Sequence, residues 1–337
     1  MIGLPIAIAL GAICGKPELE LEVLRYVSPE YVELGKNMID GGRISIRLKD
    51  GISEKLYIEV EMTAGEHQAK AIIAGSHTAF AYMEKDGETL LNEFSKESSG
   101  GQCGDSAPQL TLAKVWEFAT TSPLDEIRFI METRRVNKAA AEQSFTGHYG
   151  HSVGRTLHCE RQRYVMGDSI FSRILSYTSA ACDARMAGAC IPVMSNSGSG
   201  NQGIAATLPV VIYAEESFAS EEKTIRSLTL SHLTAIYIKQ SLGRLSALCG
   251  CVVAATGSGC GIAYLMGGGY PEISATVKNM VANLTGMICD GAKPSCAMKL
   301  TSGVSTAVIS AIMAMEGHCA TPVEGIIEAD VDNTIRN

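Results

Sequence analysis

The sequence has no run of basic residues and no positively charged lead at its N-terminus. Its 28 Lys and Arg residues are outnumbered by 36 Asp and Glu residues, which gives a formal net charge of −8. Because nucleic acids and anionic membrane surfaces attract basic patches, both are disfavoured as partners. The apolar N-terminus also lacks the charged start of a secretory signal peptide. We therefore expect a cytoplasmic protein.

The cysteines lack the even, regular spacing of a disulfide framework. There are 11 of them, and most lie in apolar surroundings. An odd number of cysteines in a protein expected to be cytoplasmic indicates reduced thiols, which are available to metals.

A long run of Leu, Ile and Phe is also missing. Residues 245–266 carry no charge and are long enough to span a bilayer. However, this stretch is rich in Gly, Ala, Ser, Thr and Cys. Small residues favour a tightly packed buried helix, so we expect no membrane partner.

The length and composition indicate a well-packed globular protein. The chain has 337 residues, of which 46% are hydrophobic, and its mean hydropathy is +0.12. Such a chain forms one large domain or two. Helical spacing marks residues 3–14 and 26–40, and Asp86–Gly87 is a strong hairpin-turn signal. Alternation of apolar and polar residues predicts strands at residues 44–48, 56–62, 69–74 and 78–83.

A change of composition divides the chain. Residues 95–108 are rich in Ser, Gly and charge and predict a linker, and the stretches that follow have helical spacing. The sequence therefore predicts an α+β fold. A small α/β domain with an antiparallel sheet occupies residues 1–108, and a mostly helical domain occupies residues 109–337.

Two cysteines, Cys289 and Cys296, flank a segment that contains Gly291 and Pro294. Gly and Pro favour a loop, which can turn both sulfurs toward one point. A further thiol is available from Cys249 or Cys251. Three thiolates from two loops would hold an iron–sulfur cluster and leave one iron open. Zinc also accepts thiolates, but structural zinc sites usually have four ligands, often in two short-spaced pairs.

The remaining cysteines need no such role. A buried free cysteine behaves as a small hydrophobic residue. This interpretation fits Cys14, Cys159, Cys182, Cys190, Cys260 and Cys319, whereas Cys103 lies in the predicted linker.

Residues 194–203 are almost all small or amide-bearing and lead into an apolar stretch. Glycine permits close backbone approach, and such a loop at a helix start presents N–H groups to an anion. A carboxylate or phosphate is the expected ligand. The segment is not a P-loop, because the Gly-Lys-Ser/Thr element is missing. A flexible linker is the alternative, although Asn201-Gln202-Gly203 continues directly into the apolar stretch.

Arg185 lies among small residues in the segment 179–188. It would suit a bidentate clamp on a substrate carboxylate, and a structural ion pair with Asp183 is an equally good interpretation.

The histidines give a weaker signal. His77 follows a glycine in an expected turn, and His148 and His151 flank Gly150 and would suit a ligand pair. His232 lies on an otherwise apolar helix, where a satisfied core histidine is the simpler interpretation.

Four of these segments together resemble one family. Residues 179–188, 195–203, 245–249 and 286–299 are similar to motifs of the iron–sulfur L-cysteine desulfidases. These enzymes are relatives of the α-chain of the oxygen-sensitive bacterial L-serine dehydratases. The motifs are long and stand in the family's order, and the resemblance extends from about Ile2 to near the C-terminus.

The resemblance implies a [4Fe–4S] cluster with three cysteine ligands, which map onto Cys249, Cys289 and Cys296. Its open iron would act as a Lewis acid on an amino-acid substrate. A base would remove the α-proton and sulfide would leave from Cβ. Aminoacrylate would then hydrolyse to pyruvate and ammonia.

The resemblance also suggests where the substrate binds. Ser197, Ser199 and Asn201 would contact its carboxylate, with Arg185 as a second anchor.

The chain departs from the family's pattern at its N-terminus. Family members carry a Gly-Cys-Thr-Glu-Pro motif, whose cysteine is the proposed base, before a Gly-Leu-Pro element that here is Gly3-Leu4-Pro5. This sequence contains no such motif. We expect either a truncated form of the enzyme or a member that has lost its base, with His77 as the candidate substitute.

Other interpretations remain open at this point. The first alternative is a serine-dehydrating variant, which the motifs do not distinguish from a cysteine desulfidase. A second class is a non-catalytic cluster-binding or redox-sensing protein, favoured by the missing base motif, and a third is a cluster-free structural remnant. We also expect a homodimer, because the glycine-rich helices offer close packing surfaces.

Overall fold

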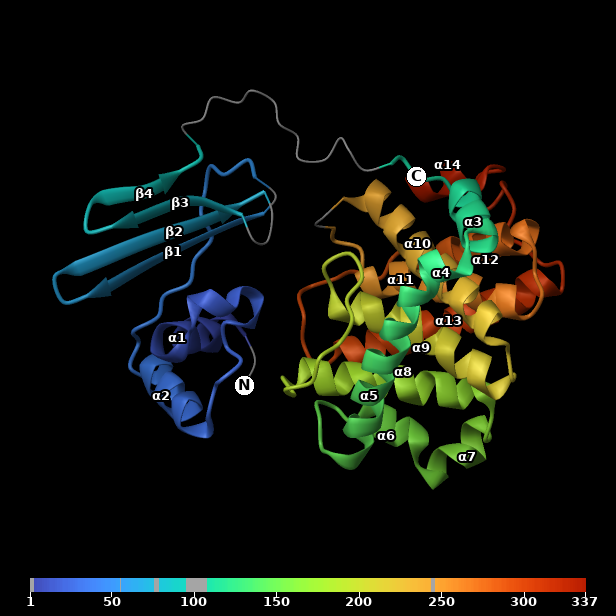
Figure 1. Ribbon diagram of the computed structural model, residues 1–337, viewed down its shortest axis with the longest axis horizontal. Helices are drawn as coiled ribbons and strands as arrows, with labels where there is room; N and C mark the ends of the chain where they lie inside the picture. Colours follow the sequence, from blue (N-terminus) through green and yellow to red (C-terminus); the bar gives the residue numbers. More distant parts are fainter. Residues whose placement is uncertain (1–2, 55, 76–78, 95–107, 244–245) are drawn as a thin grey trace. The chain divides into compact units, whose positions relative to one another are not determined.

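The computed structural model describes residues 3–54, 56–75, 79–94, 108–243 and 246–337. These residues form two compact units (Figure 1). One consists of residues 1–44 and 110–337, and the other of residues 45–109. The predicted linker lies almost wholly outside the described residues, so the domain boundary near residue 108 stays a prediction.

The N-terminal segment folds as a pair of helices with a small apolar core. Helix α1 spans Leu4–Cys14, a 3₁₀ turn follows at Pro17–Glu22, and α2 spans Pro29–Asp40. The buried residues of α1 are Ile6, Ala9 and Leu10. Gly35 of α2 permits close contact, since a Cβ there would lie 2.9 Å from the Ile6 Cδ1 atom. Both helices agree with the predicted helical spacing.

The four strands form an antiparallel meander in the order β1-β2-β3-β4 (Figure 1). They span Tyr57–Ala64, His67–Ala74, Phe80–Lys85 and Glu88–Asn92. The Asp86–Gly87 turn has positive φ at both residues, +51° and +81°, as a two-residue type I′ hairpin requires. Three of the predicted strands are therefore confirmed, and the hairpin adds β4.

The strand predicted at residues 44–48 was wrong. This stretch has no regular secondary structure, although Ile46 and Leu48 alternate with polar residues. Leu48 is 94% exposed and Ile46 48% exposed. Alternation stabilises a strand only where one face is buried against a neighbour, and here neither apolar side chain is buried.

The remainder is helical, and its core lies around α9 and α11. The helices are α3 (Leu112–Thr121), α4 (Leu124–Ile127), a 3₁₀ turn (Arg128–Ile130), α5 (Met131–Thr146), α6 (Val153–His158), α7 (Glu160–Met166), α8 (Ile170–Met186), α9 (Gly200–Glu216), α10 (Glu221–Leu242), α11 (Gly250–Leu265), α12 (Tyr270–Leu284), α13 (Cys296–Met315) and α14 (Val331–Arg336). Helix α11 packs against α9, α10, α12 and α13, and α8 packs against α9 and α13. Together with the sheet, this arrangement confirms the predicted α+β fold.

Small residues let the core helices approach closely. Almost every residue of α11 is buried, as an apolar helix without a polar face requires. The uncharged stretch at residues 245–266 thus contains the buried helix that its composition predicted. Among the described residues, only α13 is long and apolar enough to span a membrane. Half of its apolar window is buried inside the protein. A core helix passes the same test.

Gly257 gives a direct test of this close packing. A Cβ at this position would lie 2.2 Å from the backbone oxygen of Ser231 in α10, which cannot move cheaply. We expect Gly257→Ala to lower the free energy of unfolding by about 1–3 kcal/mol, measured by urea denaturation. Gly11→Ala is the matched control, because Gly11 is also helical but has nothing within 4 Å of its added Cβ. Equal stability of both variants would contradict the described packing.

Candidate functional site

Two cysteine-bearing segments pair through their backbones. The Cys249 N–H donates to the Met287 carbonyl at 2.9 Å, and the Cys289 N–H donates to the Ala247 carbonyl at 2.7 Å. These bonds flank an antiparallel bridge between Leu248 and Ile288. Since side chains alternate along a ladder, the two cysteines lie on the same face of it. The structure thus brings together two segments that are about 40 residues apart in sequence.

Cys296 is the first residue of α13, so the loop predicted around it ends one residue earlier. Its sulfur accepts a hydrogen bond from the Lys293 N–H at 3.5 Å, and its thiol lies 3.9 Å from the Gly291 carbonyl oxygen. Cys249 also stands at a helix start, one position earlier, as the N-cap of α11. Helix N-termini carry partial positive charge, which stabilises a thiolate.

The surroundings of Cys249 favour its ionised form. A hydrogen bond from the Cys251 thiol, with the N–H groups of Cys251 and Val252, holds the pKa of the Cys249 thiol below its usual range, although burial opposes this. The same thiol–thiol interaction and burial raise the pKa of Cys251. Cys249 is therefore the better thiolate of the two.

Two further cysteines belong to this group: Cys251, which the sequence offered as the alternative to Cys249, and Cys182, which was not predicted as part of it. Cys182 of α8 and Cys251 of α11 are buried, and both lie within electrostatic range of Cys249 and Cys296. Burial raises the pKa of the Cys182 thiol. The apolar setting of Cys182 in the sequence gave only the signal of a core residue, and the proximity of α8, α11 and α13 could not be predicted from it.

A lysine secures the segment between Cys289 and Cys296. The Lys299 ammonium of α13 donates to the Ile288 carbonyl and to the Asp290 carboxylate, both at 2.8 Å. Asp290 also pairs with Lys293, and these two ammonium groups hold the pKa of its carboxyl well below the usual range. Lys299 further lies within electrostatic range of Cys249 and Cys289, and its charge favours the Cys249 thiolate.

The described residues contain no group of three or more His, Cys, Asp or Glu side chains close enough to hold one metal ion. A multi-iron cluster imposes a different demand, because each thiolate binds its own iron and the sulfurs stand farther apart. The donor chemistry fits such a cluster: two of the three predicted cysteines lie at helix N-termini, and the third is joined to one of them through the ladder.

One side of Cys249 borders an apolar cavity of about 180 Å³. Its lining comes mainly from α10, α11, α12 and the C-terminal helix, and consists largely of Leu, Ile, Val and Met. Such surroundings have a low effective dielectric constant, which strengthens the interactions of the thiolate with nearby charges.

The predicted glycine-rich loop forms a tight turn followed by a helix start. Asn196 and Ser199 exchange both backbone hydrogen bonds, at 3.1 and 3.0 Å. Between them Ser197 and Gly198 have φ of +49° and +78°, the left-handed pair of a type I′ turn. Ser199 is the N-cap of α9, and its hydroxyl accepts from the Gln202 N–H. The segment is thus a helix N-terminus, as predicted, and not a linker.

This helix start lies against the cysteine group. Arg185 donates to the Asn201 Oδ1 atom at 3.1 Å, and the Cys182 thiol lies 3.5 Å from the same oxygen. Gly200 makes room for the arginine, because a Cβ there would stand 2.3 Å from the Arg185 Nε atom. On the other side the Gln202 side chain covers Gly250, the residue after Cys249.

Of the predicted substrate residues, the structure brings Arg185 and Asn201 into direct contact. Ser199 uses its hydroxyl to cap α9, and the Ser197 hydroxyl donates to the Asn196 side chain at 2.8 Å. The alternative partner of Arg185 was Asp183, but the Asp183 carboxylate turns away and accepts from the Gly154 N–H at 2.9 Å.

His232 is the buried core histidine that the apolar helix suggested. Its Nδ1 atom lies 3.1 Å from the Asn196 amide nitrogen, and its Nε2 atom lies 3.0 Å from the Thr207 hydroxyl. It therefore fixes the turn that precedes α9. Burial lowers the pKa of the imidazole to about 4, so the ring stays neutral at physiological pH.

The other histidine predictions find little support. His148 lies 2.9 Å from the Arg155 guanidinium, an unsuitable neighbour for a metal ligand because a cation repels a metal ion. His77 lies outside the described residues.

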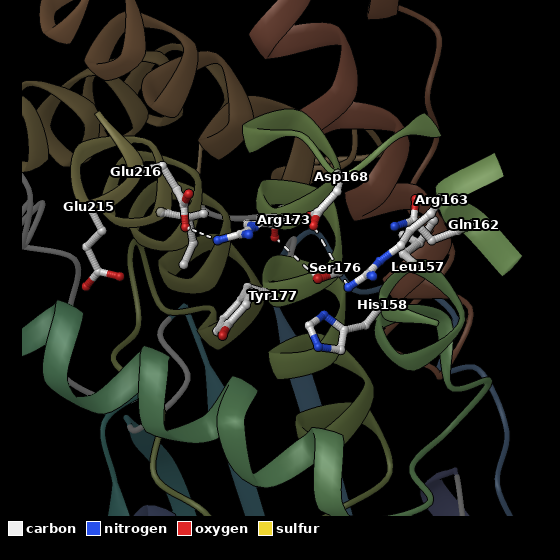
Figure 2. Close-up of a pocket in the computed structure, with 12 residues that line it drawn as sticks. Leu157, His158, Gln162, Arg163, Asp168, Arg173, Ser176, Tyr177, Glu215 and Glu216 are labelled. Carbon is white, nitrogen blue, oxygen red and sulfur yellow. Dashed lines mark hydrogen bonds and ion pairs between the residues drawn. The ribbon is translucent and has the colours of Figure 1, made fainter. Parts of the chain in front are cut away.

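A polar cavity of about 130 Å³ lies between α6, α7, α8 and α9 (Figure 2). Within it Arg173 pairs with Glu216 at 2.6 Å and with Asp168 at 3.5 Å, as the dashed lines in Figure 2 mark. Its lining includes none of the sequence-predicted site residues that the structure describes. The candidate functional site is therefore at the cysteines.

The neutral state of His232 predicts a pH dependence of stability. A histidine whose pKa is lowered on folding, from 6.5 to about 4, stabilises the fold above pH 6.5, and this contribution is lost as the pH falls toward 4. The expected loss is about 3 kcal/mol between pH 7 and pH 4. In His232→Gln that part of the slope should disappear, and in the surface control His318→Gln it should remain. Identical slopes in both variants would refute a neutral buried imidazole.

Comparisons with known proteins agree with the resemblance at the level of the family. The family profile described as serine dehydratase alpha chain matches residues 18–337. A UPF0597 protein of Bacteroides fragilis is 66% identical over 337 residues, which cover 100% of this chain and 78% of the relative. UPF0597 proteins of Porphyromonas gingivalis and Shewanella pealeana are 51% and 44% identical, each again over 100% of this chain, and over 79% and 78% of the relative. The chain belongs to the serine dehydratase alpha chain family.

Proposed function

We propose that the chain is an amino-acid lyase that releases sulfide from L-cysteine, with a [4Fe–4S] cluster held by Cys249, Cys289 and Cys296. The observation that carries this proposal is the backbone pairing of the two cysteine segments, next to the N-terminus of α9. The family supports a lyase, and the cysteine ladder supports the cluster.

The reaction consumes one water and forms pyruvate, ammonium and hydrogen sulfide from L-cysteine. The elimination breaks the Cα–H and Cβ–S bonds, and hydrolysis of the resulting aminoacrylate by the water then breaks the Cα–N bond. The protein must therefore hold the substrate, accept a proton and stabilise the leaving sulfur. When bound, the cluster would supply an open iron that acts as a Lewis acid.

The chain's own residues serve the first of these tasks. The N–H groups at the start of α9 and the positive end of its dipole suit a carboxylate. Arg185 adds a guanidinium beside Asn201, and Gly200 leaves room for the arginine side chain. These groups would bind the substrate carboxylate, with Ser197 and Ser199 shaping the turn. The charge of Lys299 would favour the thiolate form of Cys249 as a ligand.

L-Serine is the second candidate substrate, because the matching family is described as serine dehydratase. The two reactions share pyruvate and ammonium and differ in the leaving group, which is sulfide from cysteine and water from serine. We further propose that the protein acts in the cytoplasm as a homodimer.

The cluster proposal predicts that each of three cysteines is needed for iron. After anaerobic reconstitution with iron and sulfide, the wild-type chain should bind four irons. It should also form pyruvate and sulfide from L-cysteine. Cys249→Ser, Cys289→Ser and Cys296→Ser should each lose most of the iron and the turnover. Cys319→Ser is the control, because Cys319 is exposed and remote in sequence from the ladder.

The outcomes separate the possible functions. Pyruvate without sulfide, from L-serine alone, would identify a serine dehydratase. Iron without turnover would indicate a cluster-binding protein. Equal iron content in all four variants would refute the three-cysteine site.

A further inference from the structure

The polar cavity between α6, α7, α8 and α9 is separate from the cysteines. Its lining includes Arg173, in the first turn of α8, and the end of α9 (Figure 2). Arg185, which belongs to the candidate site, stands in the last turn of α8. The two arginines are separated by about 18 Å of helix. A ligand in this cavity would therefore occupy a second site.

Two carboxylates that line the cavity are firmly paired with cations. Glu216 accepts a hydrogen bond from Arg173 at 2.6 Å, and Glu215 accepts from Arg134 and Lys138, each at 2.8 Å. Charge-assisted hydrogen bonds of this length are strong. A cationic ligand would have to compete with these partners, so the cavity does not suit one.

Arg163 is the cation of the cavity that lacks a close partner. Its Nη2 atom lies 3.9 Å from the Asp168 Oδ2 atom, which is too far for a hydrogen bond, as the dashed line in Figure 2 marks. Asp168 lies nearer to Arg173, at 3.5 Å. Within the described part of the chain, the Arg163 side chain makes no other ion pair or hydrogen bond. Its planar fork of N–H donors matches a carboxylate.

Tyr177 and His158 add two more groups without an acceptor to the lining. Their ring centroids lie 6.3 Å apart, and Phe145 packs against both rings. These contacts hold the rings in place. However, the Tyr177 hydroxyl and the His158 ring nitrogens have no hydrogen-bond partner among the described residues. Both side chains can donate. The cavity thus has donors from α6, α7 and α8 whose acceptors the described chain does not supply.

The size and the remaining walls of the cavity favour a short organic molecule. Leu157 and Ile212 also line it, and they suit a hydrocarbon group. The volume of about 130 Å³ is well below the roughly 300–1,000 Å³ of pockets for drug-sized ligands. The ligand therefore has only a few non-hydrogen atoms.

We propose that this cavity binds a small organic carboxylate, with Arg163 as its charged anchor and Tyr177 and His158 as further donors to it. Leu157 and Ile212 contact its hydrocarbon part. This inference goes beyond the proposed function, because it depends neither on the cluster nor on the lyase reaction. It gives the chain a second anion site, at the opposite end of α8 from Arg185.

Binding of propionate and of its neutral isostere propionamide tests the charge requirement. Ligand-observed NMR on the purified chain should show that propionate binds about ten- to a hundredfold more tightly, the range for hydrogen bonds with a charged group. Amide hydrogen exchange should slow in residues 157–177 when propionate is present. Slowing only around Arg185 would place the ligand at the candidate site and refute the second site.

Two variants remove the proposed contacts and keep most of the side-chain volume. Arg163→Met should abolish the preference for propionate, and Tyr177→Phe should reduce it by about tenfold. Arg161→Met and Tyr164→Phe are the matched controls, because both residues are exposed on α7 and line a different surface groove. Both controls should keep the preference. Circular dichroism and thermal unfolding verify that each variant is folded.

The other outcomes also decide the question. Equal binding of propionate and propionamide to the wild-type chain would refute the carboxylate site, and so would a preference that Arg163→Met retains. If inorganic phosphate binds more tightly than propionate with the same dependence on Arg163, the cavity is a general anion site and the carboxylate proposal is wrong. None of these results changes the iron content of the reconstituted chain, so the lyase proposal would stand.

Discussion

Two backbone hydrogen bonds determine the arrangement of the candidate site. They join the segment that enters α11 to the segment that approaches α13, and so place Cys249 and Cys289 on one face of a short ladder. Without this pairing the cysteines would belong to two independent loops. With it, the ends of two buried helices, which the core holds rigidly, determine where the thiols lie.

The same constraint explains the charge pattern around the site. Cys249, Cys296 and the glycine-rich turn each stand at the beginning of a helix. Helix N-termini favour anions, and here they gather two thiols and a predicted carboxylate site in one region. Lys299 reinforces the effect from α13. The chain thus concentrates positive potential in a protein whose net charge is −8.

The sequence predicted most of the helices and strands, but not which of them contact one another. The meander, the helical remainder and the helix start after the glycine-rich turn followed from periodicity and turn residues. The strand at residues 44–48 failed because alternation does not reveal whether a partner exists. The sequence suggested Asp183 only as an ion-pair partner of Arg185. Its hydrogen bond with the Gly154 N–H, in the first turn of α6, could not be predicted because the two residues are 29 positions apart. The sequence indicated only a core residue at Cys182, because the cysteines near it lie on other helices.

The central claim is that three cysteines hold a cluster with one open iron, to which an amino acid binds. Mössbauer spectroscopy of the chain reconstituted with ⁵⁷Fe tests it most directly, with and without added L-cysteine. The account predicts one iron that differs from the other three and changes its signal when L-cysteine is added. Four irons that do not respond to the amino acid, or no cluster spectrum at all, would contradict it.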